Sequence, residues 1–520
     1  MNTECGLIGI IGKEEINYKT VLESLIKLQH RGRESYGLSY IKKEDNKKNK
    51  LHIEKHYGLI NEHELSNTIK NMYSKVWFGH VRYSTSGKKQ NNNNNINNSF
   101  IDLTQPIAFT FSKYNDTAFI YNGNVPMFIW EKLFINYPKL KEYYNKNIAL
   151  DIDINDSLLF IRLIILLKEE YTRNVSIKEL NINNETNKTI IIGKILNKIV
   201  SLIDRAFCIV IQFDNECWVI RDKYGVRPLV YGLSENNKSI IISSENCCFN
   251  DNYRLVGDIK PGCIVKMDYK TLNIKLMSQI YSPVKKHCIF EYFYFMRKNT
   301  TVNDISVLEF RTNIGKLLFE ELKKKDKLYK SLVKYDKNNK YDKKRENKLN
   351  NIIVCGIPES GIVQAQSFSE ALNASYIQLI EKNPKNQQRT FILDNNKKRL
   401  DACKNKYQIS KFNQKFIKDK KIILVDDSIV RGNTVKYLIK FIREYKPKEI
   451  HFMSASPPIV NICNYGVDFP DIEDLIAARR NIVDIEKELN INSLTYLNKK
   501  TFNNINSEYN NKFCLECFNN

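Results

Sequence analysis

Short apolar runs separated by turn residues dominate the first half of the chain, a pattern typical of strands. One helix is expected over Thr20–Leu28, because its apolar residues recur on one face at helical spacing. The first half is therefore expected to consist mainly of strands. The runs that predict them are Gly6–Gly12, Val76–Val81, Ala118–Tyr121, Ala206–Phe213 and Cys217–Arg221.

From about residue 283, longer apolar strands are each followed by a polar loop and then a helix. Asn351–Ile357 precedes the loop Pro358–Gly361, and Lys421–Val425 precedes the loop Asp426–Thr434. After the second loop, apolar residues at i, i+3, i+4 and i+7 predict a helix. Repeated strand–loop–helix units indicate a parallel α/β domain, in which ligands bind beyond the carboxyl ends of the strands. Both polar loops are expected at that edge.

Composition narrows the class of protein. With 520 residues, 42% of them hydrophobic, the chain is expected to form two or more domains with true cores. No apolar run reaches the ~18–20 residues of a membrane span, and no signal-peptide pattern opens the chain. Twelve cysteines are too sparse for a disulfide framework, so a soluble cytoplasmic protein is expected. Asn91–Asn95, with Asn97 and Asn98, is expected to form a low-complexity loop, and Asn174–Lys188 and Lys323–Asn351 are expected to be polar surface insertions.

The net charge of +23 raises the question of nucleic-acid binding. The lysines lie in hydrophilic stretches with Asn and Asp, such as 335–345, and no RNA-binding signature or zinc-finger spacing accompanies them. We interpret the basic composition as a bias of the source genome and expect no nucleic-acid partner.

Cys5 lies at the start of the first apolar run. Removal of the four preceding residues would place its thiol beside a free α-amino group. Such an amine has a pKa of about 7.7–8.0 and can accept the thiol proton. This arrangement predicts an N-terminal nucleophile and makes Met1–Glu4 a propeptide. The alternative is a small buried cysteine at the edge of a strand, a common environment for this residue type.

The loop Asp426–Thr434 combines several groups that suit a phosphorylated sugar. Two carboxylates, Asp426 and Asp427, end a buried strand, where they need hydroxyls, a metal or hydrogen-bond donors as partners. A hydroxyl, an arginine and a glycine follow and open onto a helix N-terminus, whose free N–H groups suit a phosphate. The alternative is an ordinary strand-to-helix turn, although such a turn needs only one capping residue.

The same loop resembles the loop of type I phosphoribosyltransferases that binds 5-phosphoribosyl 1-diphosphate (PRPP). The longer match Leu424–Gly432, with Ser454–Pro458 downstream, resembles the amidophosphoribosyltransferase family. The resemblance extends from Cys5 to Cys517 and is interrupted by the polar insertions. Further matching blocks are Leu28–Gly32, Gly79–Thr85, Tyr121–Asn124, Arg221–Pro228, Ser243–Glu245, Pro261–Gly262 and Cys288–Tyr292.

The resemblance implies two domains and a tail. After a propeptide at 1–4, residues 5–265 would form a class II glutamine amidotransferase (glutaminase) domain of the four-layer αββα type. Residues 283–480 would form a type I phosphoribosyltransferase domain with a parallel sheet, and 481–520 a C-terminal tail. The implied reaction converts glutamine, PRPP and water into 5-phosphoribosylamine, glutamate and diphosphate, the first step of purine synthesis.

For the glutaminase, the resemblance implies that Cys5 attacks the side-chain amide of glutamine, giving a thioester and ammonia. Asn122 and Gly123 would form the oxyanion hole. Arg82 would bind the α-carboxylate of glutamine, and Asp156 would bind its α-ammonium group. Taken singly, these residue types are more common in surface ion pairs and turns, so only the joint pattern supports these roles.

For the transferase, the resemblance implies that Pro358–Gly361 binds diphosphate and that Ser428–Thr434 holds the 5′-phosphate. Asp426 and Asp427 would bind the ribose hydroxyls and, with Ser360, a Mg²⁺ ion, which prefers oxygen ligands. The residues expected to bind PRPP are Pro358, Glu359, Ser360, Gly361, Lys382, Asp426, Asp427, Ser428, Ile429, Val430, Arg431, Gly432, Asn433 and Thr434.

The segment Lys382–Phe391 matches both ends of the family's mobile loop, which closes over PRPP and couples the two sites. The usual Arg-Tyr at its centre is absent. This divergence supports an alternative hypothesis, a regulatory nucleotide-binding protein with an inactive or uncoupled transferase. By resemblance, purine nucleotides are the expected inhibitors, and a homo-oligomer, either dimer or tetramer, is the expected assembly.

Cys514 and Cys517 form a C-x-x-C pair, which alone indicates half a zinc site or a thiol pair. Cys288 and Cys463 lie in blocks where the iron–sulfur branch of the family has two further ligands. The resemblance thus implies one 4Fe-4S cluster bound by these four cysteines, since four thiolates suit such a cluster. A four-cysteine zinc site is the alternative.

Overall fold

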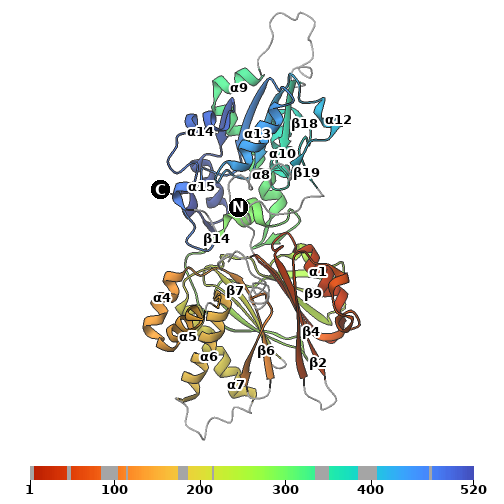
Figure 1. The fold of residues 1–520 in the computed structure, drawn as a ribbon, viewed down its shortest axis with the longest axis vertical. Coiled ribbons are helices and arrows are strands. Elements are labelled where there is room, and N and C mark those ends of the chain that lie inside the picture. Colours follow the sequence, from red (N-terminus) through yellow and green to blue (C-terminus); the bar gives the residue numbers. More distant parts are fainter. Residues whose placement is uncertain are drawn as a thin grey trace, which may run out of the picture.

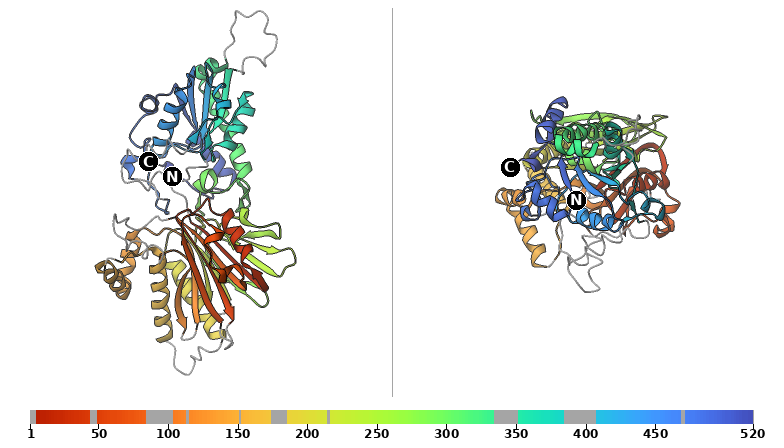
Figure 2. Two further views of the ribbon diagram at one scale, coloured as in Figure 1. Left: turned by 45° about the vertical axis from the view of Figure 1, so that its right-hand side comes forward. Right: turned by 90° about the horizontal axis from the view of Figure 1, so that it is seen from above.

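The computed structural model describes residues 5–43, 49–83, 103–112, 115–150, 152–173, 185–213, 216–333, 351–383, 407–467 and 471–519. These residues form two domains, drawn one above the other in Figure 1 and still distinct in the turned view of Figure 2. The N-terminal domain contains two large antiparallel sheets, and the C-terminal domain contains one parallel sheet. No described helix combines the length and the apolar character needed to cross a membrane.

The first sheet of the N-terminal domain has seven strands, with β1 (Gly6–Asn17) near its middle. β1 pairs antiparallel with β4 (Tyr73–Arg82), and Gly6 lies opposite Val81, so that Cys5 lies beside the end of β4. The remaining strands are β2 (Ser35–Lys43), β3 (Asn49–Tyr57), β9 (Val230–Ser234), β10 (Ser239–Ser243) and β11 (Tyr253–Asp258).

Helix α1 (Tyr18–Lys27) covers the outer face of this sheet, where its buried residues share a core with Ile8 and Ile10 of β1. The helix predicted over Thr20–Leu28 is therefore confirmed, although it begins two residues earlier. Asn17 explains the early start, because its side chain accepts a hydrogen bond from the N–H of Lys19 and so caps the helix.

The second sheet has six strands in the order β13-β12-β8-β7-β6-β5. Its inner face packs on the first sheet through a core that joins Leu7 and Phe78 to Ile120 and Val210. Its outer face packs on α6 (Asp156–Arg173) and α7 (Glu185–Leu202). This arrangement confirms the predicted four-layer αββα fold. The strands are β5 (Ile107–Ser112), β6 (Asn115–Gly123), β7 (Phe207–Phe213), β8 (Glu216–Arg221), β12 (Cys263–Asp268) and β13 (Ile274–Gln279).

The C-terminal domain is built on the parallel sheet β18-β17-β21-β22-β23. Alternate residues of each strand point to opposite faces, so the sheet divides two cores. Ile423 and Val425 of β21 pack in the core of α8 and α10, whereas Ile422 and Leu424 pack against α13. The parallel α/β prediction is confirmed. The strands are β17 (Ile352–Gly356), β18 (Ser375–Tyr376), β21 (Lys421–Asp426), β22 (Glu449–Ser454) and β23 (Ser493–Tyr496).

Further helices and short strands complete the two domains. In the N-terminal domain they are α2 (Asn67–Lys70), α4 (Met127–Asn136) and α5 (Pro138–Ala149). In the C-terminal domain the helices are α8 (Val307–Lys324), α9 (Asp326–Val333), α10 (Ile362–Leu372), α12 (Lys411–Gln414), α13 (Asn433–Arg443), α14 (Ile482–Leu489) and α15 (Lys499–Glu508). The short strand pairs are β14 (His287–Cys288) with β24 (Phe513–Cys514), β15 (Thr301–Val302) with β16 (Ile305–Ser306), and β19 (Glu381–Lys382) with β20 (Tyr407–Gln408).

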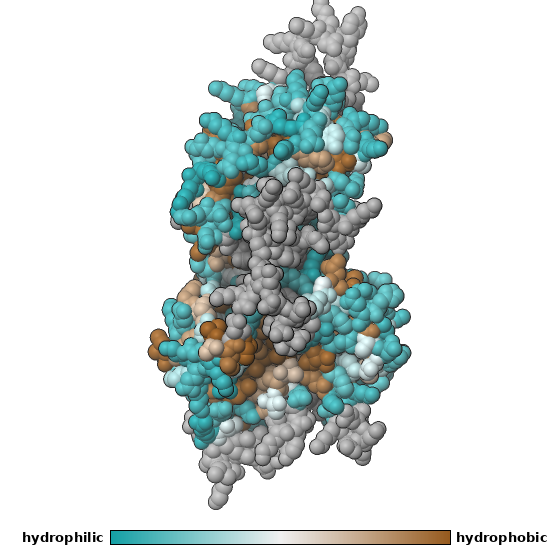
Figure 3. Space-filling model, viewed as in Figure 1, coloured by the Kyte–Doolittle hydropathy of each residue, from teal (hydrophilic) through white to brown (hydrophobic). Residues whose placement is uncertain are grey.

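Two predicted boundaries need correction. The first domain does not end at 265, because β13 pairs with β12 and extends the second sheet to Gln279. The segment 481–520 is not a separate tail, because β23 pairs in parallel with β22 and completes the sheet of the C-terminal domain. Figure 3 shows that hydrophilic residues cover most of the viewed face of the molecule, with hydrophobic patches chiefly on the N-terminal domain.

Candidate active sites

Cys5 lies where the end of β4 meets the start of β1. Its thiol donates to the carbonyl of Tyr83 at 3.3 Å and accepts from the N–H of Tyr83 at 3.4 Å. The Nε of Arg31 donates to the Cys5 carbonyl at 3.0 Å, which fixes the backbone of this residue. Cys5 as a whole is partly buried.

Arg82, the last residue of β4, places a positive charge close to this thiol. It is 5% exposed. Burial lowers the pKa of the Arg82 guanidinium, and the charges of Cys5 and Glu34 oppose that shift. A guanidinium presents a planar pair of donors, an arrangement that suits a carboxylate.

Asn122 and Gly123 end β6 in the second sheet. Both polar atoms of the Asn122 side chain are buried and have no hydrogen-bond partner among the described residues. Leaving a buried amide unpaired costs about 1–3 kcal/mol, so its partner is expected to be a ligand or solvent. Gly123 allows close packing here, because a Cβ atom would lie 2.4 Å from the Ala206 carbonyl oxygen.

Asp156 begins α6 and is held in the protein by three donors. Its carboxylate accepts from the Tyr121 hydroxyl at 3.2 Å, the Val125 N–H at 2.8 Å and the Trp130 indole N–H at 2.9 Å. Burial raises the pKa of Asp156 to about 6, although the three hydrogen bonds oppose the shift. The sequence did not reveal these three partners.

The second candidate site lies at the carboxyl edge of the parallel sheet, as predicted. The Ser360 hydroxyl donates to Asp427 at 2.6 Å, and the Ser428 hydroxyl donates to the other oxygen of the same carboxylate at 2.5 Å. The structure thus brings together the loops after β17 and β21. Asp426 accepts from the N–H of Asp427 at 2.9 Å. These carboxylate and hydroxyl oxygens are the ligand type that Mg²⁺ prefers.

Gly432 links this edge to α13. Its φ of +77° lies in the left-handed region, which glycine adopts without strain, and it occupies the N-cap position of the helix. The helix N-terminus, with its free N–H groups, therefore faces the loop Ser428–Thr434. Arg431 in the same loop pairs with Asp474 at 3.1 Å, and this pair is partly exposed to solvent.

Two cations meet at Glu359 in the loop after β17. The guanidinium of Arg297 donates to Glu359 at 2.5 Å, and the Lys382 ammonium lies 3.5 Å from its other oxygen. Burial would raise the pKa of Glu359, but the positive charges of Lys382 and Arg297 outweigh it and hold the pKa below its usual value. Of the predicted mobile loop, residues 384–391 lie outside the described residues.

The four cysteines predicted as cluster ligands line one cavity. Cys288, Cys463, Cys514 and Cys517 are brought together by the pairing of β14 with β24 and by the loop after β22. The Cys463 sulfur accepts backbone N–H groups from Tyr465 and Val467, each at 3.3 Å. Burial raises the pKa of Cys514 to about 12, so its thiol stays neutral unless a cation binds.

The spacing of these sulfurs bears on the choice between iron–sulfur and zinc. Four thiolates on one zinc ion lie about 3.8 Å apart, because each Zn–S bond is about 2.3 Å. No three of the four described sulfurs lie within 4.8 Å of one another. The four sulfurs are therefore not arranged as in a preformed four-cysteine zinc site.

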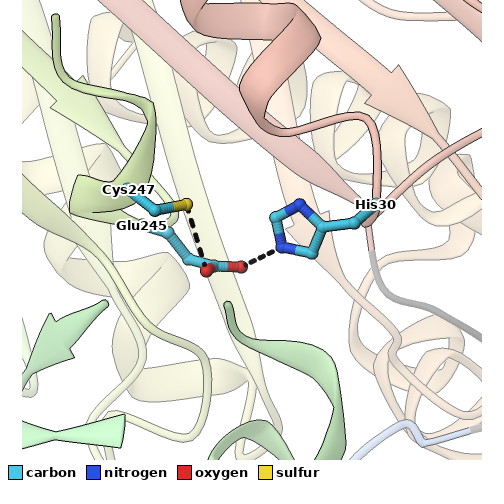
Figure 4. A group of neighbouring side chains, drawn as sticks. All are labelled: His30, Glu245 and Cys247. Carbon is cyan, nitrogen blue, oxygen red and sulfur yellow. Dashed lines mark hydrogen bonds and ion pairs between the residues drawn. The ribbon is translucent and has the colours of Figure 1, made fainter. Parts of the chain in front are cut away.

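His30, Glu245 and Cys247 form the one compact group of potential metal ligands among the described residues (Figure 4). Glu245 is fully engaged by protein donors and lies 2.6 Å from the Arg31 guanidinium, so the site is unsuited to a cation. The five donors to Glu245 are His30, Arg31, Cys247, the backbone N–H of Arg297 and the hydroxyl of Thr300. No pattern in the sequence had assigned a role to Glu245.

Comparison with known proteins covers nearly the whole chain. The phosphoribosyl transferase domain model matches residues 328–455, from α9 to the end of β22. An amidophosphoribosyltransferase of Methanocaldococcus jannaschii is 29% identical over 510 residues, which cover 95% of this chain and 92% of that protein. The amidophosphoribosyltransferase of Bacillus subtilis is 27% identical, covering 99% of this chain and 93% of the relative.

Two solved structures of similar fold also match nearly the whole chain. The fold matches glutamine PRPP amidotransferase from Bacillus subtilis in complex with ADP and GMP, with a TM-score of 0.72 and 25% identity. That match covers 99% of this chain and 96% of the solved chain. A second structure, described as the allosteric regulatory enzyme of purine biosynthesis, matches with a TM-score of 0.73 over 99% of this chain.

Proposed function

This chain belongs to the amidophosphoribosyltransferase family, and we propose that it transfers ammonia from glutamine to C1 of PRPP. The observation that carries the proposal is the buried side chain of Asn122, whose amide has no hydrogen-bond partner among the described residues; we propose that it serves the same site as Cys5. An oxyanion formed when a thiolate adds to an amide would satisfy the Asn122 N–H donor at the moment it develops.

In the first half-reaction, the Cys5 sulfur forms a bond to the amide carbon of glutamine. The C–N bond then breaks, and ammonia leaves with the proton that the thiol had supplied to the α-amino group. Water hydrolyses the thioester to glutamate and restores the thiol. In this proposal, Arg82 binds the substrate carboxylate and Asp156 binds its ammonium group. Because this chemistry needs a free amine on Cys5, Met1–Glu4, which lie outside the described residues, must be removed.

In the second half-reaction, ammonia forms a bond to C1 of PRPP as the bond from C1 to the diphosphate oxygen breaks. In this proposal, Asp426 and Asp427 bind the ribose hydroxyls, and the N-terminus of α13 binds the 5′-phosphate. Mg²⁺ held by Ser360, Asp426 and Asp427 would neutralise charge on the departing diphosphate. The remaining predicted contacts, in Pro358–Gly361 and Ser428–Thr434, line the same edge of the sheet.

A 4Fe-4S cluster on Cys288, Cys463, Cys514 and Cys517 is part of the proposal, with a structural role. It would tie β24 near the C-terminus to β14 between the two domains. Inhibition by purine nucleotides is also proposed, since the Bacillus subtilis structure holds ADP and GMP. A homo-oligomer completes the proposal.

Synthesis of 5-phosphoribosylamine by purified, anaerobically prepared protein tests the function. Product from glutamine and PRPP, with glutamate in equal amount, is expected. No product with either glutamine or ammonium chloride would contradict the enzyme and favour the regulatory homologue. Product from ammonia alone would mean that the glutaminase or its coupling is lost. Intact-mass measurement of the same sample checks that the chain begins at Cys5.

Iron and acid-labile sulfide analysis, together with visible absorption, tests the cluster. The wild type is expected to hold about four of each per chain. Cys514→Ser is expected to lose both, whereas Cys263→Ser, which changes a cysteine outside the cavity, is expected to keep them. Stoichiometric zinc in the anaerobic wild-type protein would contradict the cluster.

A further inference from the structure

A continuous series of ion pairs and hydrogen bonds joins the nucleophile to the diphosphate-binding loop. It begins at Cys5, whose carbonyl accepts from Arg31. Arg31 pairs with Glu245 at 2.6 Å, and Glu245 accepts from the N–H of Arg297 at 2.9 Å. The Arg297 guanidinium then pairs with Glu359 at 2.5 Å. Only three residues therefore lie between the two candidate sites.

The half of this network nearest Cys5 is fully buried. The side chains of Arg31 and Glu245 are completely buried, and Arg31 also makes two hydrogen bonds to the buried Glu291, at 2.8 and 3.0 Å. Removing one member of such a buried pair leaves an uncompensated charge, so neither partner can leave without the other moving. Glu291 and Glu245 thus clamp Arg31, and Arg31 in turn holds the backbone of Cys5.

In the half of the network nearest the transferase, the ion pairs are exposed and can be replaced by pairs with another anion. The side chains of Arg297 and Glu359 are 41% and 53% exposed, and Lys382 approaches Glu359 from the other side. Exposed ion pairs are worth about 0–1 kcal/mol, so a competing anion separates them easily. A diphosphate in this loop brings concentrated negative charge beside Glu359, which repels this carboxylate and attracts its two cations. A diphosphate bound in this loop would therefore compete with Glu359 for the Arg297 side chain.

We propose that Glu245 and Arg297 are positioning residues that carry the occupancy of the diphosphate-binding loop to Cys5. The inference rests on the proposed function, because it assigns the coupling between its two half-reactions. The Arg297 backbone N–H and the Thr300 hydroxyl, at 2.7 Å, both bind the same Glu245 oxygen. A shift of the segment 297–300 changes how Glu245 shares its charge with Arg31, and so changes the placement of the Cys5 backbone.

The test is a coupling ratio: kcat/KM for glutamine hydrolysis with saturating PRPP, divided by the same quantity without PRPP. A wild-type ratio above one is expected. Arg297→Met removes the link to Glu359 but keeps the backbone link to Glu245, and should lower the ratio by about fivefold or more. Arg297→Lys keeps the positive charge but lacks the planar pair of guanidinium donors, and should restore part of the coupling ratio. Lys298→Met, which removes a positive charge at the exposed neighbouring position, should keep the wild-type ratio.

Thr300→Val tests the second link, because it removes one donor to Glu245 without changing any charge. If both residues act in series, the double variant with Arg297→Met should lower the ratio no further than the larger single change. Fully additive losses would contradict a shared route. A purely structural role predicts instead that hydrolysis without PRPP and thermal stability fall together while the ratio is preserved.

Failure of this inference can be distinguished from failure of the proposed function. A wild type that hydrolyses glutamine and makes 5-phosphoribosylamine, with unchanged ratios in Arg297→Met and Thr300→Val, overturns the network alone. A wild-type ratio of one also overturns it. A wild type without glutamine hydrolysis or synthesis in any condition overturns the proposed function, and the network with it.

Discussion

The two candidate active sites differ in how much of each is fixed before a substrate arrives. Around Cys5 the polar groups are buried: Asn122 is 0% exposed, and Asp156 is buried and held by three neutral donors. Around Asp427 several charged groups meet in partly exposed ion pairs, such as Arg431 with Asp474. Buried, preorganised donors act on developing charge without reorganisation, whereas exposed pairs yield to a stronger anion. The donors of the first candidate site are thus held mainly by buried protein contacts, whereas the ion pairs of the second can be exchanged by a bound anion.

The largest expected effect is a loss of glutamine-dependent synthesis without loss of ammonia-dependent synthesis. Cys5→Ala should lower glutamine-dependent synthesis by about 10³-fold or more, since it removes the nucleophile. Ammonia-dependent synthesis, which needs only the transferase, should stay within about twofold. Parallel assays with glutamine and ammonium chloride measure both. Equal loss in the two assays would mean that the sites are not independent.

Substitution of Asn122 tests whether its buried amide is the oxyanion donor of the first candidate site. Asn122→Ala should lower kcat for glutamine hydrolysis by about 10²–10³-fold and leave KM nearly unchanged, because an oxyanion donor acts mainly in the transition state. Asn124→Ala is the matched control, since that side chain instead donates to the Gly466 carbonyl at 3.4 Å. A rise in KM alone would assign Asn122 to substrate binding.

Asp427, at the centre of the second candidate site, can be tested by substitution in the same way. Asp427→Asn should lower synthesis from both glutamine and ammonia by about a hundredfold, because it weakens the ligands for ribose and Mg²⁺. Glutamine hydrolysis without PRPP should persist. Asp326→Asn, on the exposed surface of α9, is the control. Loss of glutamine hydrolysis in Asp427→Asn would contradict the division into two sites.

The smallest effect concerns pH. Because the pKa of Asp156 is raised to about 6, its negative charge is present above that pH and lost below it. KM for glutamine should therefore rise by up to about tenfold per pH unit as pH falls below 6, since the protonated acid cannot pair with an ammonium group. KM for PRPP should not follow this curve. In Asp156→Asn, KM should be high and independent of pH over the same range.

The sequence predicted a strand or helix correctly where the hydrophobic pattern within that element was sufficient to identify it. The continuous apolar run before Asp426 predicted β21, and apolar residues spaced along one face predicted α13. β23 was missed because it has only four residues, and its pairing with β22 depends on contacts distant in the sequence. Short strands carry too little periodicity to be distinguished from loop.

The same distinction applies to the candidate sites: the sequence predicted features that depend on neighbouring residues, and missed contacts between residues far apart in the chain. The loops after β17 and β21 were expected at one sheet edge, and the structure joins them through Ser360 and Asp427. The partners of Asp156 and the central position of Glu245 were not foreseen. Those contacts join residues from different elements, and the sequence contains the groups without the geometry that pairs them.

The parallel pairing of β14 with β24 also orders events during synthesis of the chain. Cys288 is made well before Cys514 and Cys517, which lie among the last residues. Because domains fold as the chain leaves the ribosome, both sheets of the N-terminal domain can form while the cysteine cavity is still open. Completion of that cavity therefore requires that translation has passed Cys517. A chain that stops before Cys514 can contain a folded first domain but never the full set of four thiols.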